Sequence, residues 1–313
     1  KGSTVFYSFG SFNHKSSDAY AFTRNWSARP ERFPTNTAGD LIFDENIMRV
    51  GSDGEIWYSP HIQTKINDNA ATGGFRGVCH KWNWDLSNTT GKNNFHFYGD
   101  KTYNASLGAA QTRFDDGGFF FLQNTTNLNV SREISSKFNL ALGAEFRYEN
   151  YQIYAGEPAS YRNYDDTKAT GAQGFPGYQP ADEVNAHRRV WGGYVDAEID
   201  VTPEWLVDLA ARVEDYSDFG FTHNYKLATR YKASSKVNIR GSFSTGFRAP
   251  SLQQINFSST FTTVQAGNIA EVKIAPNYSS LAKAAGIPNL TQEKSLSGSL
   301  GFTWKATPEL NVT

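Results

Sequence analysis

Apolar and polar residues alternate along several stretches of the chain, most clearly between residues 237 and 252. In the run VNIRGSFSTGFRAPSL, apolar residues such as Val237, Ile239 and Phe243 take odd positions, and polar residues take most even positions. A period of two predicts a β-strand with one apolar and one polar face, and Pro250 removes a backbone donor at its end. The apolar face forms a core in a soluble sandwich, whereas it faces lipid in a membrane barrel.

Two other predicted strands carry charged residues on their polar face. Between residues 138 and 149, Glu145 and Arg147 alternate with apolar residues, and Asp196 lies in the same kind of pattern between residues 190 and 201. A sandwich core does not tolerate such charges unpaired. The pattern therefore favours a barrel whose polar face lines a wet interior.

The connections between the predicted strands are of two kinds. Very short turns are expected near residues 80, 135, 203, 235 and 308. Long irregular segments are expected at 14–71, 155–187 and 250–294, the last with a short helix at 279–285. Short turns at one end and long loops at the other are typical of bacterial membrane barrels, with short periplasmic turns and long extracellular loops. We count about eleven strands. An odd number of strands does not close into a bacterial single-chain barrel, and eleven is about half of the ~22 strands in plugged outer-membrane transporters.

The composition narrows the class of protein further. Hydrophobic residues make up 39% of the 313 residues, and no apolar run approaches the ~20 residues that a spanning helix needs, which excludes a helical membrane protein. The net charge of −1 gives no field that draws nucleic acid. The single cysteine, Cys79, excludes an internal disulfide framework and disfavours a thiolate metal site.

The sequence lacks a convincing catalytic set. The run from Ser280 to Lys283 fits S-x-x-K, but its companion motifs are missing. The six histidines lack metal-ligand spacing, and the pairs 115–116 and 165–166 are aspartates in turn-like sequence. We therefore expect no enzyme activity, no cofactor and no metal site.

One short motif and several longer matches resemble the TonB-dependent receptor family of Gram-negative outer membranes. The motif consists of Gly246, Phe247, Arg248, Ala249 and Pro250, followed by Ser251 and Leu252. Further segments that resemble the family are RVEDYSDFG at 212–220, GEPASY at 156–161, GFPG at 174–177, PNL at 288–290 and EKS at 293–295. The resemblance covers residues 72 to 313 and is weaker before them.

The resemblance implies a 22-stranded antiparallel transmembrane barrel closed by an N-terminal plug. Such a receptor takes up a scarce nutrient, such as an iron-siderophore or another metal chelate, with energy relayed by the TonB complex through the plug. The chain begins at Lys1 without an initiator Met and shows no plug or TonB box. We therefore expect residues 1–313 to be a segment of one barrel domain in the outer membrane, in contact with lipid.

Two other readings remain open at this stage. The chain fits a structural or adhesive outer-membrane barrel whose loops bind a partner or a glycan without transport. It also fits a soluble all-β glycan-binding protein, which would be extracted without detergent.

The candidate site residues fall into two groups. Arg248 lies near the outer end of its strand, where it either touches substrate or the plug or pairs with Glu214 or Asp215 inside the barrel. Substrate contacts are expected at loop tips that face the interior, since such loops move and carry aromatic and cationic side chains. The candidates there are Tyr161, Arg162, Gln173, Phe175 and Arg188.

Overall fold

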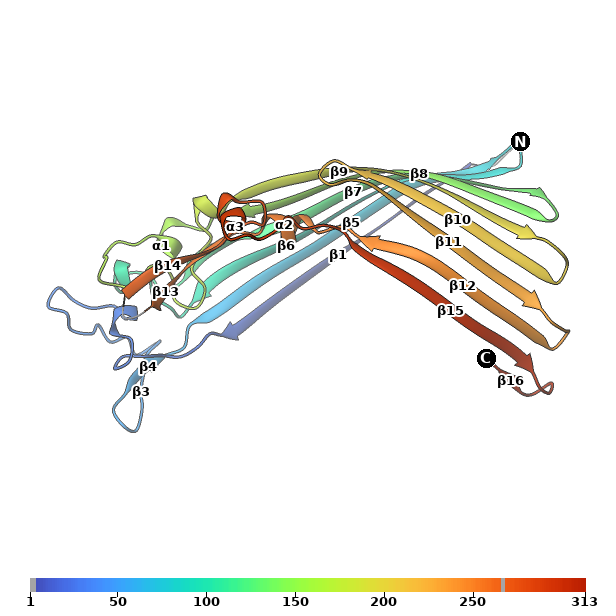
Figure 1. The fold of residues 1–313 in the computed structure, drawn as a ribbon. Helices are drawn as coiled ribbons and strands as arrows, with labels where there is room; N and C mark the ends of the chain where they lie inside the picture. Colours follow the sequence, from blue (N-terminus) through green and yellow to red (C-terminus); the bar gives the residue numbers. More distant parts are fainter. Residues whose placement is uncertain (1–3, 266–267) are drawn as a thin grey trace.

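A computed structural model describes residues 4–265 and 268–313; residues 1–3 of the expected barrel domain and residues 266–267 of the third long loop lie outside the described residues. The chain forms one curved, open antiparallel sheet with its loops gathered at one end (Figure 1). In sheet order, which is also chain order, the strands are β1 (Thr4–Tyr20), β5 (His61–Cys79), β6 (Trp82–Asp100), β7 (Phe114–Ser135), β8 (Phe138–Tyr154), β9 (Val184–Asp200), β10 (Trp205–Tyr216), β11 (Gly220–Lys232), β12 (Val237–Arg248), β15 (Glu293–Lys305) and β16 (Asn311–Val312). The prediction of about eleven antiparallel strands is confirmed.

The two faces of the sheet differ as the alternation predicts. Ala197 pairs with Leu209, Leu209 with Leu227, and Leu227 with Phe243, so an apolar row crosses β9 to β12. Leu209, Leu227 and Phe243 are 45–49% exposed, and no second sheet covers them in the described part of the chain. The apolar face is therefore an outer surface rather than a sandwich core. Among the described residues, no helix has the length and apolar character to cross a membrane.

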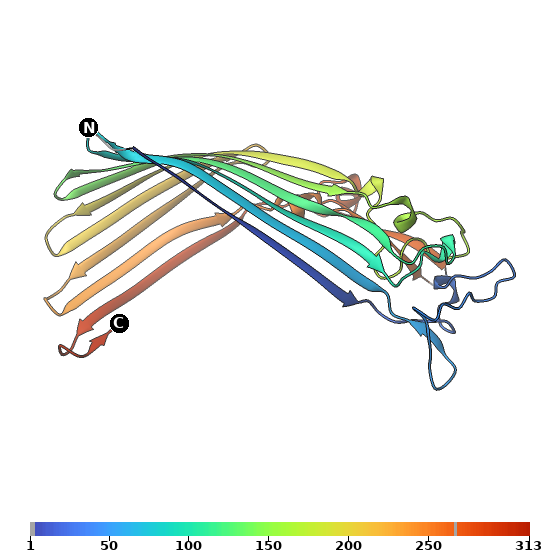
Figure 2. The same ribbon diagram turned by 180° about the vertical axis from the view of Figure 1, so that it is seen from behind.

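The ends of the strands differ as sharply as the faces. Tight turns join β5 to β6, β7 to β8, β9 to β10, β11 to β12 and β15 to β16 at one end, and both termini lie there (Figure 2). The β5–β6 turn consists of His80 and Lys81, both with positive φ (51° and 70°), as a two-residue hairpin that follows the strand twist requires. The predicted turns near 80, 135, 203, 235 and 308 are confirmed.

The strands at the loop end are longer than the sequence pattern indicates. β1 continues to Tyr20 and β5 begins at His61, so the first loop is 21–60 instead of 14–71. The pair Asp115–Asp116 likewise lies inside β7, not in a loop. In these parts both faces carry polar residues, so backbone pairing continues where hydrophobic alternation stops.

The three long loops and the β6–β7 connection contain short helices or strands of their own. The first contains β2 (Arg24–Asn25), η1 (Pro30–Arg32), β3 (Arg49–Val50) and β4 (Ile56–Tyr58). The connection between β6 and β7 contains η2 (Ala105–Leu107), and the second long loop contains α1 (Pro158–Tyr161) and η3 (Pro180–Asp182). The third contains α2 (Leu252–Asn256), the hairpin β13 (Ser259–Gln265) and β14 (Asn268–Ile274), and α3 (Ser280–Ala284). The last helix confirms the one predicted at 279–285.

Two apolar cores hold these loops in place. The first joins the buried residues Phe33, Met48, Tyr58 and Tyr103, so the first loop packs against the β6–β7 connection. Burial raises the pKa of Tyr103, and the neutral phenol donates a hydrogen bond of 3.2 Å to the Asp44 carboxylate.

The second core lies against the inner face of the sheet. It joins Tyr151 and Ile153 of β8 to Tyr178 of the second loop and Leu252 of α2, all at most 3% exposed. These β8 residues share the face of Glu149, because side chains two apart point the same way. The loops therefore fold inward over the end of the polar inner wall.

Candidate functional site

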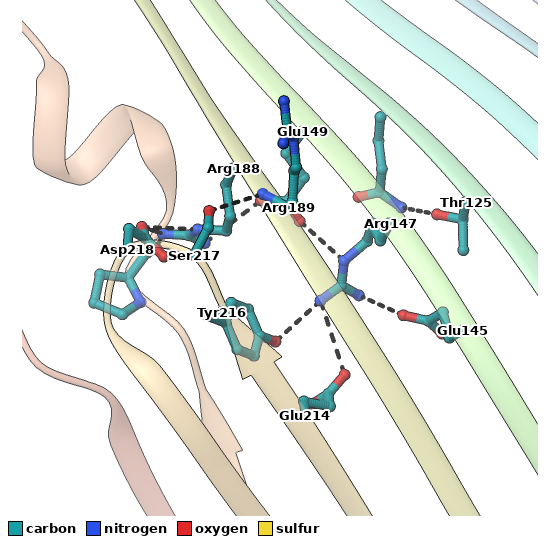
Figure 3. A network of polar contacts seen from close by, with 12 residues as sticks. Thr125, Glu145, Arg147, Glu149, Arg188, Arg189, Glu214, Tyr216, Ser217 and Asp218 are labelled. Atoms are coloured by element: carbon teal, nitrogen blue, oxygen red, sulfur yellow. Dashed lines mark hydrogen bonds and ion pairs between the residues drawn. The ribbon is translucent and has the colours of Figure 1, made fainter.

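A network of charged side chains lies on the inner face of the sheet (Figure 3). Its member Glu149 is two residues from Tyr151 of the second core. Its members come from β8, β9 and β10 and from the turn after β10, which the strand order brings together although they are far apart in sequence. They are Arg147, Arg188, Arg212, Glu145, Glu149, Glu214 and Asp218.

Arg147 lies at the centre of this network. Its guanidinium lies 3.4 Å from Glu145, 3.2 Å from Glu149 and 3.9 Å from Glu214, and it donates a hydrogen bond of 3.0 Å to the Tyr216 hydroxyl. Glu145 and Glu149 flank it on the same strand at spacings of two residues. The alternation of charges along β8 therefore becomes a set of ion pairs on one face.

Gly192 allows the network to cross from β8 to β10. The register aligns Glu145 with Gly192 and Gly192 with Glu214, so a residue without a side chain lies between two carboxylates. A Cβ atom at this glycine would lie 3.2 Å from Arg212 Nη2. The open space lets Arg212 reach Glu145 at 3.2 Å as well as Glu214 at 2.8 Å.

Arg188 is the most buried member, with 2% of its surface exposed. Its Nε and Nη2 donate to Asp218 at 2.9 and 2.6 Å, and its Nη1 donates to Glu149 at 3.4 Å. Nη2 also donates to the Pro250 carbonyl oxygen at 2.8 Å. All three nitrogens donate hydrogen bonds within the protein. This guanidinium therefore joins β9 to Glu149 of β8, to the turn after β10 and to the motif that ends at Pro250.

A second polar contact joins two of the long loops. The Asp182 carboxylate is fully buried and accepts hydrogen bonds of 2.9 Å from the Ser258 hydroxyl, the Thr260 amide and the Thr260 hydroxyl. Lys273 of β14 lies 3.6 Å from the same carboxylate. Asp182 therefore attaches the base of the β13–β14 hairpin to the second loop.

The three long loops enclose a pocket of about 330 Å³ that we call the loop pocket. The first loop contributes two arginines, the second a run around Gln173, and the third several apolar residues. The lining residues are Arg24, Arg32, Thr170, Ala172, Gln173, Gly174, Phe175, Pro176, Phe257, Ser259, Phe261 and Ile274. Its volume is in the range of small-molecule sites.

The five predicted loop residues separate into three places. Gln173 and Phe175 line the loop pocket. Arg188 lies in the ionic network of the wall. Tyr161 ends α1 and is half-buried, and Arg162 next to it is exposed; neither lines the loop pocket.

The expected pairing of Arg248 with Glu214 or Asp215 is wrong. Arg248 is exposed and its register partner is Glu293 of β15, while Glu214 pairs with Arg147 and Arg212. Phe247 contacts Tyr216 of β10 with ring centres 5.8 Å apart, whereas the adjacent Arg248 points the other way, because neighbouring side chains of a strand alternate in direction. The motif contacts the network through the Pro250 carbonyl oxygen and the Phe247 ring instead.

The sequence pattern missed Arg24, Arg32 and Phe257 of the loop pocket and the Asp182 contact. The charges on β8 and β10 were visible as an inward pattern, but their partners depend on the register of strands joined by long loops. Within residues 4–265 and 268–313, no three histidine, cysteine or acidic side chains gather as a metal site.

Comparison with known proteins gives one family. The family model described as TonB dependent receptor-like, beta-barrel, matches residues 4–313. No curated protein sequence matches the chain significantly.

Solved structures share the fold at low sequence identity. The siderophore receptor PirA from Acinetobacter baumannii is 15% identical, with a TM-score of 0.52 over 80% of this chain and 34% of its own. A variant of the ferric enterobactin receptor PfeA from Pseudomonas aeruginosa is 12% identical, with a TM-score of 0.54 over 99% and 49%. The RagAB peptide transporter is 12% identical, with a TM-score of 0.52 over 87% and 32%. The chain thus spans between a third and a half of the length of these structures.

Proposed function

Because this chain belongs to the TonB-dependent receptor β-barrel family, we propose that its protein takes up a scarce nutrient across the outer membrane of a Gram-negative bacterium. The observation that carries the proposal is the loop pocket, which three long loops build at one end of a wall with an apolar outer face. A pocket at the loop end is placed to capture a solute from outside the cell. Members of this family are transporters, and we propose transport rather than catalysis for this chain.

The proposed substrate is an iron-siderophore or another metal chelate. PirA and PfeA carry names of siderophore receptors, which supports this choice, although the similarity to them extends to the fold alone. The contacts proposed for the substrate include Gln173 and Phe175 in the loop pocket and Tyr161 and Arg162 beside it.

The remaining parts of the proposal concern partners. Residues 1–313 belong to one barrel domain, whose exposed apolar face contacts outer-membrane lipid. A plug domain closes the complete ring and transmits energy from the TonB complex. Loop capture comes first, binding against the plug follows, and plug rearrangement then releases the substrate inward.

Uptake by intact cells tests this function. A strain lacking the gene is grown on single iron, cobalamin or glycan sources, and uptake of each labelled compound is compared with the parent strain. We expect loss of uptake for one compound, restored by the gene on a plasmid and abolished when the proton-motive force is dissipated. Undiminished uptake of every compound tested would refute the proposed function.

A further inference from the structure

The loop pocket combines two positive groups with an apolar wall. Arg24 belongs to β2 and Arg32 to η1, and both side chains are partly buried at the pocket. None of the described residues that line the pocket is a carboxylate. The pocket therefore brings two guanidinium groups together without an acid between them.

The two arginines have few partners of their own. Arg24 donates to the Phe22 carbonyl at 2.5 Å and to Gln173 Oε1 at 3.4 Å, both neutral oxygens. Burial, together with repulsion from Arg32, lowers the pKa of Arg24, although an arginine remains charged at neutral pH. The Arg24 guanidinium is thus a partly buried cation that lies near a second cation, the Arg32 guanidinium.

Arg32 carries an unsatisfied donor. Its Nε is buried without a hydrogen bond and lies 3.6 Å from Glu31 Oε1, a carboxylate that also faces Arg29 at 3.7 Å. This shared contact of 3.6 Å, longer than a hydrogen bond, leaves the Arg32 guanidinium without a close ion pair of its own. Both arginines are therefore suited to receive an oxyanion.

Three other residues of the pocket lining are phenylalanines, and contacts outside the pocket hold them in position. The ring of Phe175 stacks on Phe97 at 4.7 Å and meets Tyr178 edge-on at 5.5 Å. Phe257 and Phe261 of the third loop also line the pocket, and the Asp182 contact holds that loop in place. A flat apolar body matches this wall, because rings stack with ring centres about 4.5–7 Å apart.

We propose that the loop pocket binds a small organic anion with a flat apolar body, whose oxyanion is held by Arg24 and Arg32. Guanidinium groups bind planar oxyanions through two parallel N–H donors, which gives strength and orientation. The inference rests on the proposed function for its place on an uptake receptor and adds the chemical class of the ligand. Gln173 assists by holding Arg24, and is a positioning residue.

Equilibrium dialysis of the full-length receptor in lipid nanodiscs tests the charge requirement. The probes are 2-naphthoate and its neutral counterpart 2-naphthamide, with empty nanodiscs as the blank. We expect the receptor to bind the carboxylate roughly tenfold more tightly than the amide, since a charge-assisted pair replaces a neutral one. Equal binding of the two probes, or no binding of the carboxylate, would overturn the inference.

Variants locate the effect at the two arginines. The double replacement Arg24→Gln and Arg32→Gln should remove the preference for 2-naphthoate and leave binding of 2-naphthamide unchanged. The matched control is Arg29→Gln in the same loop, because Arg29 is 44% exposed and does not line the pocket. A preference that survives the double replacement, or is lost equally in the control, would contradict the assignment.

A folding control and an uncoupled binding assay separate the possible causes of a negative result. Heat-dependent mobility on a denaturing gel reports whether each variant folds, and the single replacements serve if the double variant does not. Binding is measured without energy coupling, so its outcome is separate from uptake. A receptor with the naphthoate preference but no uptake refutes only the proposed function, and uptake without the preference refutes only the anion site.

Discussion

Arg188 of β9 donates a hydrogen bond of 2.8 Å to the carbonyl oxygen of Pro250, which lies two residues after the end of β12. β10 and β11 lie between these two strands in the sheet, so the contact spans the inner side of the wall. It ties the end of the family motif to a guanidinium that is already fixed by Glu149 and Asp218.

Replacing Arg188 with Gln should strongly destabilise the barrel. The change removes the buried partner of Asp218 and one of the two arginines that pair with Glu149, and breaking one side of a buried ion pair costs about 3–5 kcal/mol. Urea unfolding of the full-length receptor in lipid vesicles measures the loss. Arg189→Gln is the matched control, because the adjacent Arg189 is exposed and should change stability little. Equal losses in both variants would show that the network is not the cause.

Replacing Gly192 with Val should disturb the ion pairs between β8 and β10. A side chain here meets Arg212 Nη2 at 3.2 Å and would push the guanidinium away from Glu145. We expect about 1–3 kcal/mol of destabilisation, the usual cost of an oversized side chain in a packed site. The neighbouring Gly193→Val provides the comparison, because its Cβ meets nothing closer than 3.6 Å. A larger effect at Gly193 would count against this account.

The replacement Asp182→Asn should loosen the third loop without unfolding the wall. The change removes the negative charge, which weakens the three hydrogen bonds from Ser258 and Thr260 and ends the ion pair with Lys273. Hydrogen exchange followed by mass spectrometry should show faster exchange at the Thr260 amide, which Asp182 protects in the native chain. Asp165→Asn, an exposed position in the second loop, should leave this amide unchanged. Unchanged exchange in the Asp182 variant would refute the role of the contact.

Asp116→Asn should stabilise the loop end of the sheet. The Asp116 side chain is fully buried in β7, and neither of its carboxylate oxygens has a hydrogen-bond partner. A buried charge without a partner is costly, and a neutral amide of the same shape should gain about 1–3 kcal/mol. Asp115→Asn should instead lower stability, because Asp115 accepts from the Gly117 amide at 2.9 Å and contacts His96 at 2.8 Å. Urea unfolding of the two variants side by side decides the matter.

The sequence predicts the wall of this protein well for a physical reason. In β12, the apolar residues Ile239 and Phe243 lie an even number of residues apart and share one exposed face, so a local pattern fixes a local structure. The short turn at His80 and Lys81 is equally local. The long loops follow no such period, which is why the loop pocket and the ends of β1 and β5 escaped prediction.

The site residues show the same limit. The loop sequence indicates Gln173 and Phe175 as candidate substrate contacts, and both line the loop pocket. Arg24 lies 149 residues from Gln173 in the chain, and no pattern within either segment indicates that they meet. The mistaken partner for Arg248 has the same origin, because the pairing of charges depends on which strands lie between them.

The inward fold of the loops sets the depth at which water reaches this part of the wall. Tyr151 and Ile153 are sealed by the second core at 1% exposure, whereas the Arg212 side chain farther down the inner face is 34% exposed. A water-soluble reagent inside the barrel would therefore reach the wall at Arg212 and not at Tyr151. The ionic network therefore marks the boundary between the part of the inner face that the loops cover and the part that stays accessible to solvent.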